Sequence, residues 1–321
     1  MDVLSDVLRV VRLTGAVFFD THARAPWAIQ SPASPALSAA MPDSERVLAF
    51  HFILDGEAWA QVVEGESQPL RLEAGEAVIV TGGREHVLSS APGMRTAPRF
   101  DLYRRREDRR LPYTVTAGAT SGPETRISCG FIGCDARPFN PVLEALPPLL
   151  VVRLNDDLVR MALSESEEAT PGGETILALL SELLFLQAVR QHLAALPAEA
   201  TGWLSGLRDR QIGQALALMH GRPDTRWTLD ALAQEVGLSR SVFAERFAAL
   251  VGLPAMQYLA HWRLQRAAWL MEVRGLGIAQ AAAEVGYESE SAFNRAFRKR
   301  LGAPPGEWRR ARAGARKNSE G

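Results

Sequence analysis

Apolar and polar positions repeat along this chain with two different periods. From Gly15 to about Val152, short runs of β-branched and apolar residues are separated by Gly, Pro and Asp, a pattern typical of strands joined by turns. The predicted strands are Ala16–Phe19, Val47–Leu54, Ala58–Val63, Ala77–Thr81, Thr125–Gly130 and Leu149–Leu154. Short strands in this number indicate a small antiparallel barrel or sandwich. The polar stretch Ala91–Thr125, rich in Arg, Pro and Gly, predicts a long loop.

Elsewhere the apolar residues recur every three to four positions, which is the period of helices packed on one face. The predicted helices are Val3–Leu13, a turn or short helix at Pro141–Pro148, Glu174–Leu196, Leu207–His220, Pro254–Val273 and a final helix around Trp308. Pro197–Gly206 has the composition of a linker, and the tail after Ala313 is expected to fray. We therefore expect a multidomain α+β protein, with a β-barrel domain over residues 1–196 and an all-α domain over residues 207–313.

The predicted helix Glu174–Leu196 has an apolar stripe that is wider than one contact needs. The stripe comprises Ile176, Leu179, Leu180, Leu183, Leu186, Val189 and Leu193. One side of it is expected to pack on the barrel, and the other to meet a second copy of the chain. The barrel side would hold Ile176, Leu180 and Leu184, and the outer side Leu179, Leu183 and Leu186. The alternative is a monomer whose barrel covers the whole stripe.

The last third of the chain contains one pattern twice: a short helix, a turn opened by Gly, and a second helix. The copies run from Trp227 to Phe247 and from Gly277 to Phe297. Near-equivalent places hold Ala233 and Ala282, Val236 and Val285, Gly237 and Gly286, Ser239 and Ser289, Phe243 and Phe293, and Phe247 and Phe297. Gly supplies the positive φ of the turn, and Ser caps the second helix. This is the geometry of helix-turn-helix units, whose second helix enters a DNA major groove.

Side chains on the outer face of each second helix are the candidate base readers. They are Arg240, Ser241, Ala244 and Glu245 in the first copy, and Glu290, Ser291, Asn294 and Arg295 in the second. Small and polar side chains at the front of a helix suit contact with base edges, although a merely solvated face has a similar composition. A further basic set fits phosphate contacts or plain solubility equally well: Arg298, Lys299, Arg300, Arg309 and Arg310.

The charge of the chain is divided unevenly between its two parts. The formal net charge is −1, with 36 Lys and Arg against 37 Asp and Glu. From Arg208 to the end there are 18 basic and 11 acidic residues, a net +7, which leaves a net −8 for the remainder. The C-terminal part is therefore the expected partner of the DNA phosphates.

With these motifs, residues from about Leu207 to Arg310 strongly resemble the AraC/XylS family of bacterial transcription regulators. The most specific segment is Gly286–Arg309, in which Glu307-Trp308 stands where the family commonly has Tyr. The resemblance implies two helix-turn-helix units on one rigid helix, here Pro254–Val273, that enter successive major grooves. It also implies double-stranded promoter or operator DNA and RNA polymerase as partners, and more often activation than repression.

The N-terminal part, over about residues 1–190, resembles more weakly the cupin domains that precede such DNA-binding domains. Gly75–His86 is similar to the second cupin motif, with Thr81 in place of its Pro, and His51–Gly56 with Trp59 lies where the first motif belongs. The resemblance implies a small-molecule or reactive effector that binds in the barrel, and the candidate effector residues are His51, Trp59 and His86. A transcription regulator with a cupin-like sensor is therefore the expected function.

Two other functions stay open at this point. His51 and His86, with His22 or Glu57, would be a weak metal site, whereas a metal usually needs three or four protein ligands. Two histidines that are hydrogen-bonded inside the barrel explain the residues as well, so no cofactor and no catalytic activity are expected. A metal-dependent cupin enzyme fused to a DNA-binding domain, and an architectural DNA-binding protein without a sensor, are the alternatives.

Two cysteines, Cys129 and Cys134, are too few for a disulfide scaffold. In a strand followed by a turn their sulfurs would meet and form a redox switch, although buried cysteines more often act as small apolar residues. The N-terminus has no signal-peptide pattern and no run approaches the length of a membrane span. We therefore expect a cytoplasmic protein with no membrane partner.

Overall fold

The computed structural model of the chain describes residues 2–10, 13–33, 46–65, 68–98, 113–134, 139–153, 155–167, 171–197 and 199–319. They form two compact units. The sheet unit comprises Leu13–Asp135 and Leu146–Ala195, and the helical unit comprises Met1–Arg12, Ala136–Ala145 and Leu196–Gly321. Two short segments, 1–12 and 136–145, thus group with the C-terminal helices and not with the strands that flank them in sequence.

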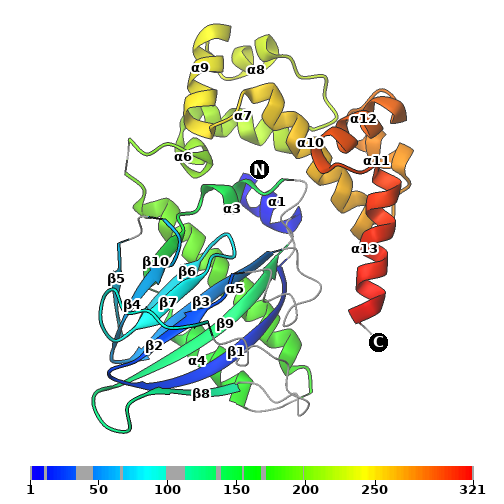
Figure 1. Cartoon of the computed structure of the whole chain (residues 1–321). Helices are drawn as coiled ribbons and strands as arrows, with labels where there is room; N and C mark the ends of the chain where they lie inside the picture. Colours follow the sequence, from blue (N-terminus) through cyan, green and yellow to red (C-terminus); the bar gives the residue numbers. More distant parts are fainter. Residues whose placement is uncertain are drawn as a thin grey trace. The chain divides into compact units, whose positions relative to one another are not determined.

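The sheet unit is built from two sheets (Figure 1). The larger has the strand order β10-β6-β3-β9-β1-β8, formed by Leu149–Arg153, Glu76–Val80, Arg46–Asp55, Glu124–Cys134, Leu13–Arg24 and Tyr113–Gly118. The smaller has the order β2-β7-β4-β5, formed by Ala28–Ser31, His86–Ser89, Glu57–Val62 and Leu70–Glu73. The described strand pairs are antiparallel apart from β1 with β8. This confirms the expected antiparallel barrel and adds one parallel pair at its edge.

Alternation along the strands separates the inside of the barrel from its outside, because successive side chains in a strand point to opposite faces. On β3, Val47, Ala49 and Ile53 belong to the apolar core that both sheets share. Leu48 and Phe52 on the same strand are also buried, on the opposite face. Both faces of the larger sheet are therefore covered, one by the smaller sheet and the other by helices.

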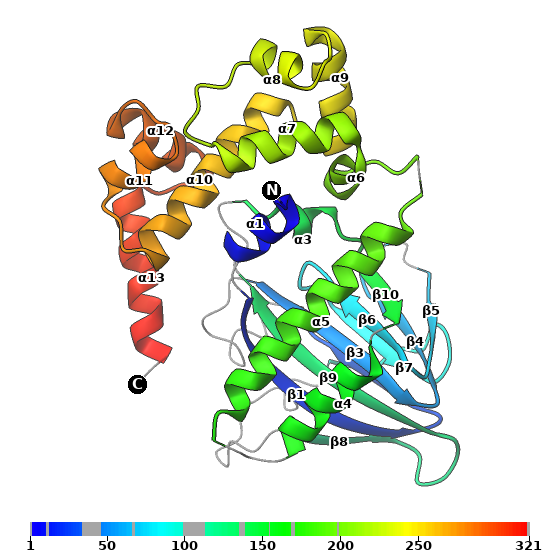
Figure 2. The same ribbon diagram turned by 180° about the vertical axis from the view of Figure 1, so that it is seen from behind.

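Helices α4 (Asp156–Glu167) and α5 (Gly173–Ala195) lie across the larger sheet, as Figure 2 shows. The buried residues of α5 follow helical spacing: Leu177, Leu180, Ser181, Leu184, Phe185, Ala188 and Val189. Its opposite face exposes Ile176, Leu179 and Leu183, with Leu179 at 61% exposure. Ile176 was expected on the barrel side and Leu186 on the outer side. Instead Ile176 is exposed and Leu186 half-buried, because Leu177 begins the buried row.

By length and composition, residues 175–195 of α5 would suffice to cross a membrane. In the described part of the chain, α5 is the one helix with this property. Sequence inspection had found no such run. In this apolar window 39% is buried inside the structure, and Ile176, Leu179 and Leu183 are exposed.

All six predicted strands are present, but four short or polar ones were missed. They are β2, β5, β7 and β8. The predicted loop Ala91–Thr125 is wrong over part of its length, because β8 occupies Tyr113–Gly118 and β9 begins at Glu124; residues 99–112 lie outside the described chain. Helix α4 was also missed. Strands of four residues give too little alternation to be seen without their partners.

The helical unit contains two short helices from the N-terminal part and eight from the C-terminal part, among the described residues. They are α1 (Val3–Val10), α3 (Pro141–Ala145), α6 (Trp203–Arg208), α7 (Arg210–Gly221), α8 (Leu229–Glu235), α9 (Arg240–Val251), α10 (Ala255–Val273), α11 (Ile278–Glu284), α12 (Glu290–Leu301) and α13 (Pro305–Ser319). The predicted linker is partly helical, since α6 begins within it and extends to Arg208. Asp209 separates α6 from α7 and accepts hydrogen bonds from the backbone N–H groups of Gln211 and Ile212. The final helix also runs past Ala313, where fraying was predicted.

Candidate functional site

The first helix-turn-helix unit is α8, a turn and α9. The hydroxyl of Thr228 caps α8 by accepting from the Ala231 N–H at 3.1 Å, and Ser239 caps α9 by accepting from Val242 N–H at 3.4 Å. Gly237 has a φ of +70°, the conformation for which the turn needs glycine. Phe243 and Phe247 are fully buried beneath α9. These contacts fix the helix on one side and leave its other side to solvent.

The second unit repeats this construction with α11 and α12. Ser289 caps α12 by accepting from the Ala292 N–H at 3.2 Å, and Gly286 has a φ of +81°. Phe293 and Phe297 are fully buried, and their rings lie 5.4 Å apart. The cap, the glycine and the two phenylalanines therefore have the roles that the repeated pattern predicts.

Contacts around the loop after α7 join the two helix-turn-helix units. From α10, the Arg263 guanidinium donates to the carbonyl oxygens of Pro223 at 2.7 Å and Thr225 at 2.8 Å. The same loop reaches the second turn, where Arg226 pairs with Glu288 at 3.1 Å. A Cβ at Gly286 would lie 2.6 Å from the carbonyl oxygen of Asp224, so the glycine allows the close approach. These contacts hold one recognition helix relative to the other.

The candidate base readers lie on the free faces of α9 and α12. Arg240, Ser241, Glu245, Glu290, Ser291 and Arg295 are exposed, and Ala244 and Asn294 are half-buried. Arg240 pairs with Asp230 of α8 at 3.3 Å, which orients it at the start of α9. Arg298, Lys299, Arg309 and Arg310 are exposed as well. Sequence reasoning missed Val242, which is 47% exposed on α9; an apolar side chain there suits the methyl group of thymine.

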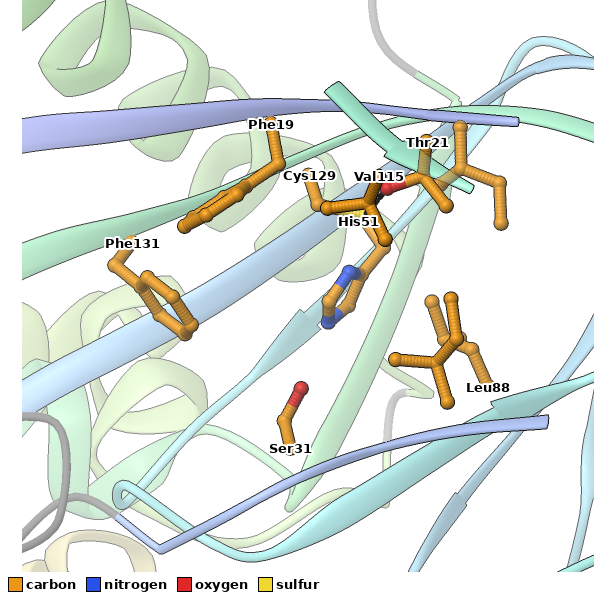
Figure 3. Close-up of a pocket in the computed structure, with 10 residues that line it drawn as sticks. Phe19, Thr21, Ser31, His51, Leu88, Val115, Cys129 and Phe131 are labelled. Atoms are coloured by element: carbon orange, nitrogen blue, oxygen red, sulfur yellow. Dashed lines mark hydrogen bonds between the residues drawn. The ribbon is translucent and has the colours of Figure 1, made fainter. Parts of the chain in front are cut away.

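A cavity lies inside the barrel, lined by residues of both sheets (Figure 3). Its lining comprises Phe19, Thr21, Ile29, Ser31, His51, Leu88, Val115, Ile127, Cys129 and Phe131. The empty space is about 440 Å³ when its opening to solvent is included, yet only about 30 Å³ can hold the centre of a water-sized molecule. The cavity is therefore narrow and mainly apolar, with no Asp, Glu, Lys or Arg among the lining residues.

His51 and His86 are brought together in this barrel. Their Nε2 atoms lie 2.8 Å apart, and the Nδ1 of His86 lies 2.9 Å from the carbonyl oxygen of Arg84. Burial lowers the pKa of His86 to about 4 and holds the pKa of His51 well below its ordinary value. Both rings are therefore neutral near pH 7. His51 lines the cavity, whereas His86 stands behind it as its hydrogen-bond partner.

Three of the predicted effector or metal residues, Trp59, Glu57 and His22, are absent from the cavity lining. Trp59 lies on β4 between the core residues Ala58 and Ala60, so it faces outward. Glu57 pairs with the exposed Arg71. No group of three or more His, Cys, Asp or Glu side chains within the described residues is placed to hold a metal ion, and the two barrel histidines bond directly to each other.

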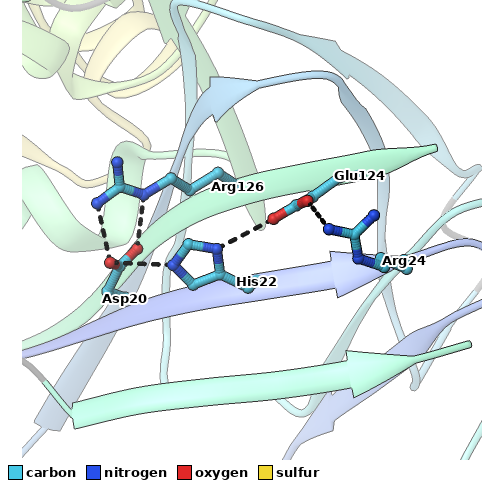
Figure 4. A network of polar contacts seen from close by, with 5 residues as sticks. All are labelled: Asp20, His22, Arg24, Glu124 and Arg126. Carbon is cyan, nitrogen blue, oxygen red and sulfur yellow. Dashed lines mark hydrogen bonds and ion pairs between the residues drawn. The ribbon is translucent and has the colours of Figure 1, made fainter. Parts of the chain in front are cut away.

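His22 belongs to a polar network on the outside of β1 and β9 (Figure 4). Its ring nitrogens lie 3.3 Å from Asp20 Oδ2 and 3.1 Å from Glu124 Oε1. Arg126 donates to both carboxylate oxygens of Asp20, at 3.1 and 2.9 Å, and Arg24 pairs with Glu124. Each charged group thus has an opposite partner, and the network is a polar covering on the outer face of these two strands.

The predicted turn between the two cysteines is absent, because both belong to the continuous strand β9. Five residues of strand separate their Cα atoms by about 16 Å, whereas a disulfide needs less than about 7 Å. Burial raises the pKa of Cys129 to about 12, so its sulfur is protonated and weakly nucleophilic. A redox switch between these residues is therefore incompatible with this fold.

A pair of capped recognition helices on one rigid helix, preceded by a barrel, defines a DNA-binding transcription regulator. Residues 2–194 match the Cupin family model and residues 232–311 match the Helix-turn-helix domain model. The chain belongs to the family of AraC-like transcription regulators with an N-terminal cupin domain.

Three comparisons illustrate the similarity. A protein of Streptomyces lividans described as an AraC-like transcription regulator is 30% identical over 97% of this chain and 98% of its own. The HTH-type transcriptional regulator AlkR of Acinetobacter baylyi is 28% identical over 96% of this chain and 99% of its own. The solved DNA-binding domain of AdpA in complex with a target DNA is 27% identical, with a TM-score of 0.30, over 31% of this chain and 89% of that one.

Proposed function

We propose that this regulator reads a specific operator through α9 and α12 and that a small effector in the barrel cavity changes its action. The observation that carries the first part is the pair of exposed, capped helix faces supported by buried Phe residues on one helical scaffold. In each face, polar side chains at the front of the helix are free to meet base edges. The basic residues of α12 and α13, beginning at Arg298 and Lys299, contact phosphates beside them.

The proposed route from the cavity to the DNA-binding helices runs through the segment of the helical unit that follows β9 in sequence. Strand β9 carries the cavity residues Ile127, Cys129 and Phe131 and leads to the segment around Phe139. There the Phe139 N–H donates to Gln265 Oε1 of α10 at 2.8 Å, and its ring packs edge-on to Tyr258 at 5.4 Å. An effector that shifts β9 would thereby bias α10. Such coupling requires different effector affinities in two states.

A second copy of the chain is the proposed partner of α5. Ile176, Leu179 and Leu183 form an exposed row at the i, i+3, i+7 spacing of a helix–helix contact. A dimer would read paired half-sites cooperatively. RNA polymerase is the proposed protein partner at the promoter, and the protein would act in the cytoplasm. The proposed domain division is a cupin-like sensor over residues 1–196 and a DNA-binding domain over residues 207–313.

Selection of genomic DNA fragments by the full-length protein tests the DNA-binding proposal. We expect enrichment of one sequence class, whose affinity falls steeply as salt rises. Arg295→Ala should weaken that enrichment and relax the preference at one or two base pairs. Arg274→Ala is the matched control, because Arg274 is exposed at the end of α10 and lies outside both recognition helices. Equal enrichment by both variants would contradict the assignment of α12 as a reading helix.

A further inference from the structure

The hydrogen bonds of the barrel histidines determine which nitrogen carries each proton. A carbonyl oxygen only accepts, so His86 Nδ1 must donate to the carbonyl of Arg84, 2.9 Å away. A neutral imidazole has one N–H, and His86 Nε2 is therefore an acceptor. The proton in the 2.8 Å contact between the two Nε2 atoms then belongs to His51. This leaves His51 Nδ1 as a lone-pair acceptor.

That acceptor is buried in the cavity without a partner. His51 is 4% exposed, and its Nδ1 has no hydrogen-bond partner among the residues that the structure describes. Figure 3 places its imidazole at the centre of the lining, between the Phe19–Phe131 pair and Leu88. Buried polar atoms are normally hydrogen-bonded to protein or to ordered water, so this acceptor requires a donor from water or from a ligand. The hydroxyl of Thr21, which also lines the cavity, donates to Cys129 Sγ at 3.8 Å.

The rest of the lining restricts the chemistry of that donor. The charged side chains Asp, Glu, Lys and Arg are absent from the ten lining residues, so an ionised ligand would lose its hydration without compensation. Phe19 and Phe131 meet edge to face, with ring centroids 5.7 Å apart, and with Leu88 they leave only a narrow apolar space. The space as it stands has room for little more than water, so a larger ligand must part the Phe19 and Phe131 rings to enter, and a flat or slender molecule displaces them least.

We propose that the cavity binds a small, uncharged, apolar molecule with one hydroxyl donor, a phenol or a slender alcohol, and that this hydroxyl donates to His51 Nδ1. The proposal rests on the sensor role proposed above and supplies the ligand chemistry that the role lacks. It separates this cavity from one built for carboxylic acids, because the recognising group here accepts a hydrogen bond and is neutral.

Isothermal titration calorimetry on the full-length protein at pH 7.5 tests the ligand class with three probes of similar shape. The probes are 4-methylphenol, 4-methylanisole and 4-methylbenzoate. We expect 4-methylphenol to bind, the ether to bind about tenfold more weakly because it cannot donate, and the charged benzoate to show no binding. Tightest binding of the benzoate, equal binding of phenol and ether, or binding of none of the probes would overturn the proposal.

Two variants assign the discrimination to His51. His51→Phe removes the acceptor and should bring the phenol and ether affinities within about twofold of each other. Leu88→Ala changes the cavity wall without touching the hydrogen bond, so it should alter both affinities and keep their ratio. An unchanged ratio in His51→Phe, with melting and DNA binding like wild type, would show that another group recognises the hydroxyl. If His51→Phe does not fold, the wild-type probe series and Leu88→Ala still decide the ligand class.

A separate measurement distinguishes failure of the ligand class from failure of the sensor role. The affinity of the wild-type protein for its selected operator is measured with and without saturating 4-methylphenol. A shift of several-fold supports both proposals together. Binding in calorimetry without any change in operator affinity or in vitro transcription would support the ligand assignment and contradict the sensor role. A response to another class of molecule, without binding of the phenol, would support the sensor role and contradict the ligand assignment.

Discussion

Adding one methyl group to each of the two turn glycines should have very different consequences, although the two turns look alike in sequence. Gly237 and Gly286 have φ values of +70° and +81°, and placing an L-residue there costs about 1–2 kcal/mol. A Cβ at Gly237 meets nothing within 4 Å. At Gly286 it would lie 2.6 Å from the carbonyl oxygen and 2.8 Å from the Cα of Asp224. Displacing that backbone adds about 1–3 kcal/mol, so Gly286→Ala should cost roughly 2–5 kcal/mol.

Thermal melting followed by circular dichroism at 222 nm compares the two variants in the full-length protein. Each kcal/mol should lower the Tm of the helical transition by about 2–4 °C for a unit of this size. Gly286→Ala should also weaken operator binding when it is folded, because Asp224 lies in the loop that joins the two recognition units. Gly237→Ala should bind DNA nearly as the wild type does at temperatures below its transition. Equal losses of Tm in the two variants would refute the close approach at Gly286.

Three further outcomes are expected. Arg295→Ala should cost about 1–3 kcal/mol at the operator and relax preference at one or two base pairs, whereas Arg310→Ala should weaken all sequences alike and reduce the salt slope by about one; a binding selection with both variants separates the two, and identical profiles would be contrary to this assignment. Burial lowers the pKa of His220 to about 3 and that of His86 to about 4, so the unfolded chain takes up protons below about pH 6.5 that the folded chain refuses. The unfolding free energy should therefore be highest above pH 6.5 and fall by up to about 1.4 kcal/mol per histidine per pH unit as the pH drops, and denaturant titrations from pH 7.5 to 4.5 that gave a flat profile would disprove it. Because burial raises the pKa of Cys129 to about 12, iodoacetamide at pH 8 should modify this residue far more slowly in the native than in the unfolded protein, and mass spectrometry that found equal rates would contradict its burial.

The helix-turn-helix units were predictable because their determinants are local. Glycine at the turn, serine at the cap and two phenylalanines on one helical face are all set by spacing within about twenty residues of sequence. The structure places Ser239 and Ser289 as caps and buries the phenylalanines accordingly. The exposure of Val242 was not predictable in the same way, because an apolar residue beside buried ones gives no sign of which side of the helix it occupies.

The barrel site depends on long-range pairing, which one sequence does not encode visibly. His51 meets His86 because β3 and β7 lie in different sheets that face each other. Trp59 was assigned to the site from its position near a motif, whereas the alternation along β4 turns it outward. Ser31 and Thr21 enter the lining through strands whose extent depends on their neighbours. The grouping of segments 1–12 and 136–145 with the helical unit likewise follows from tertiary packing alone.

Footprinting of the full-length protein on its selected operator tests the central claim most directly. If α9 and α12 both read DNA from one scaffold, two protected major-groove segments should appear on one side of the duplex, about one helical turn or 10 base pairs apart. Arg240→Ala should weaken contacts in one segment, and Arg295→Ala in the other. A single protected segment, or two variants that weaken the same segment, would contradict the account.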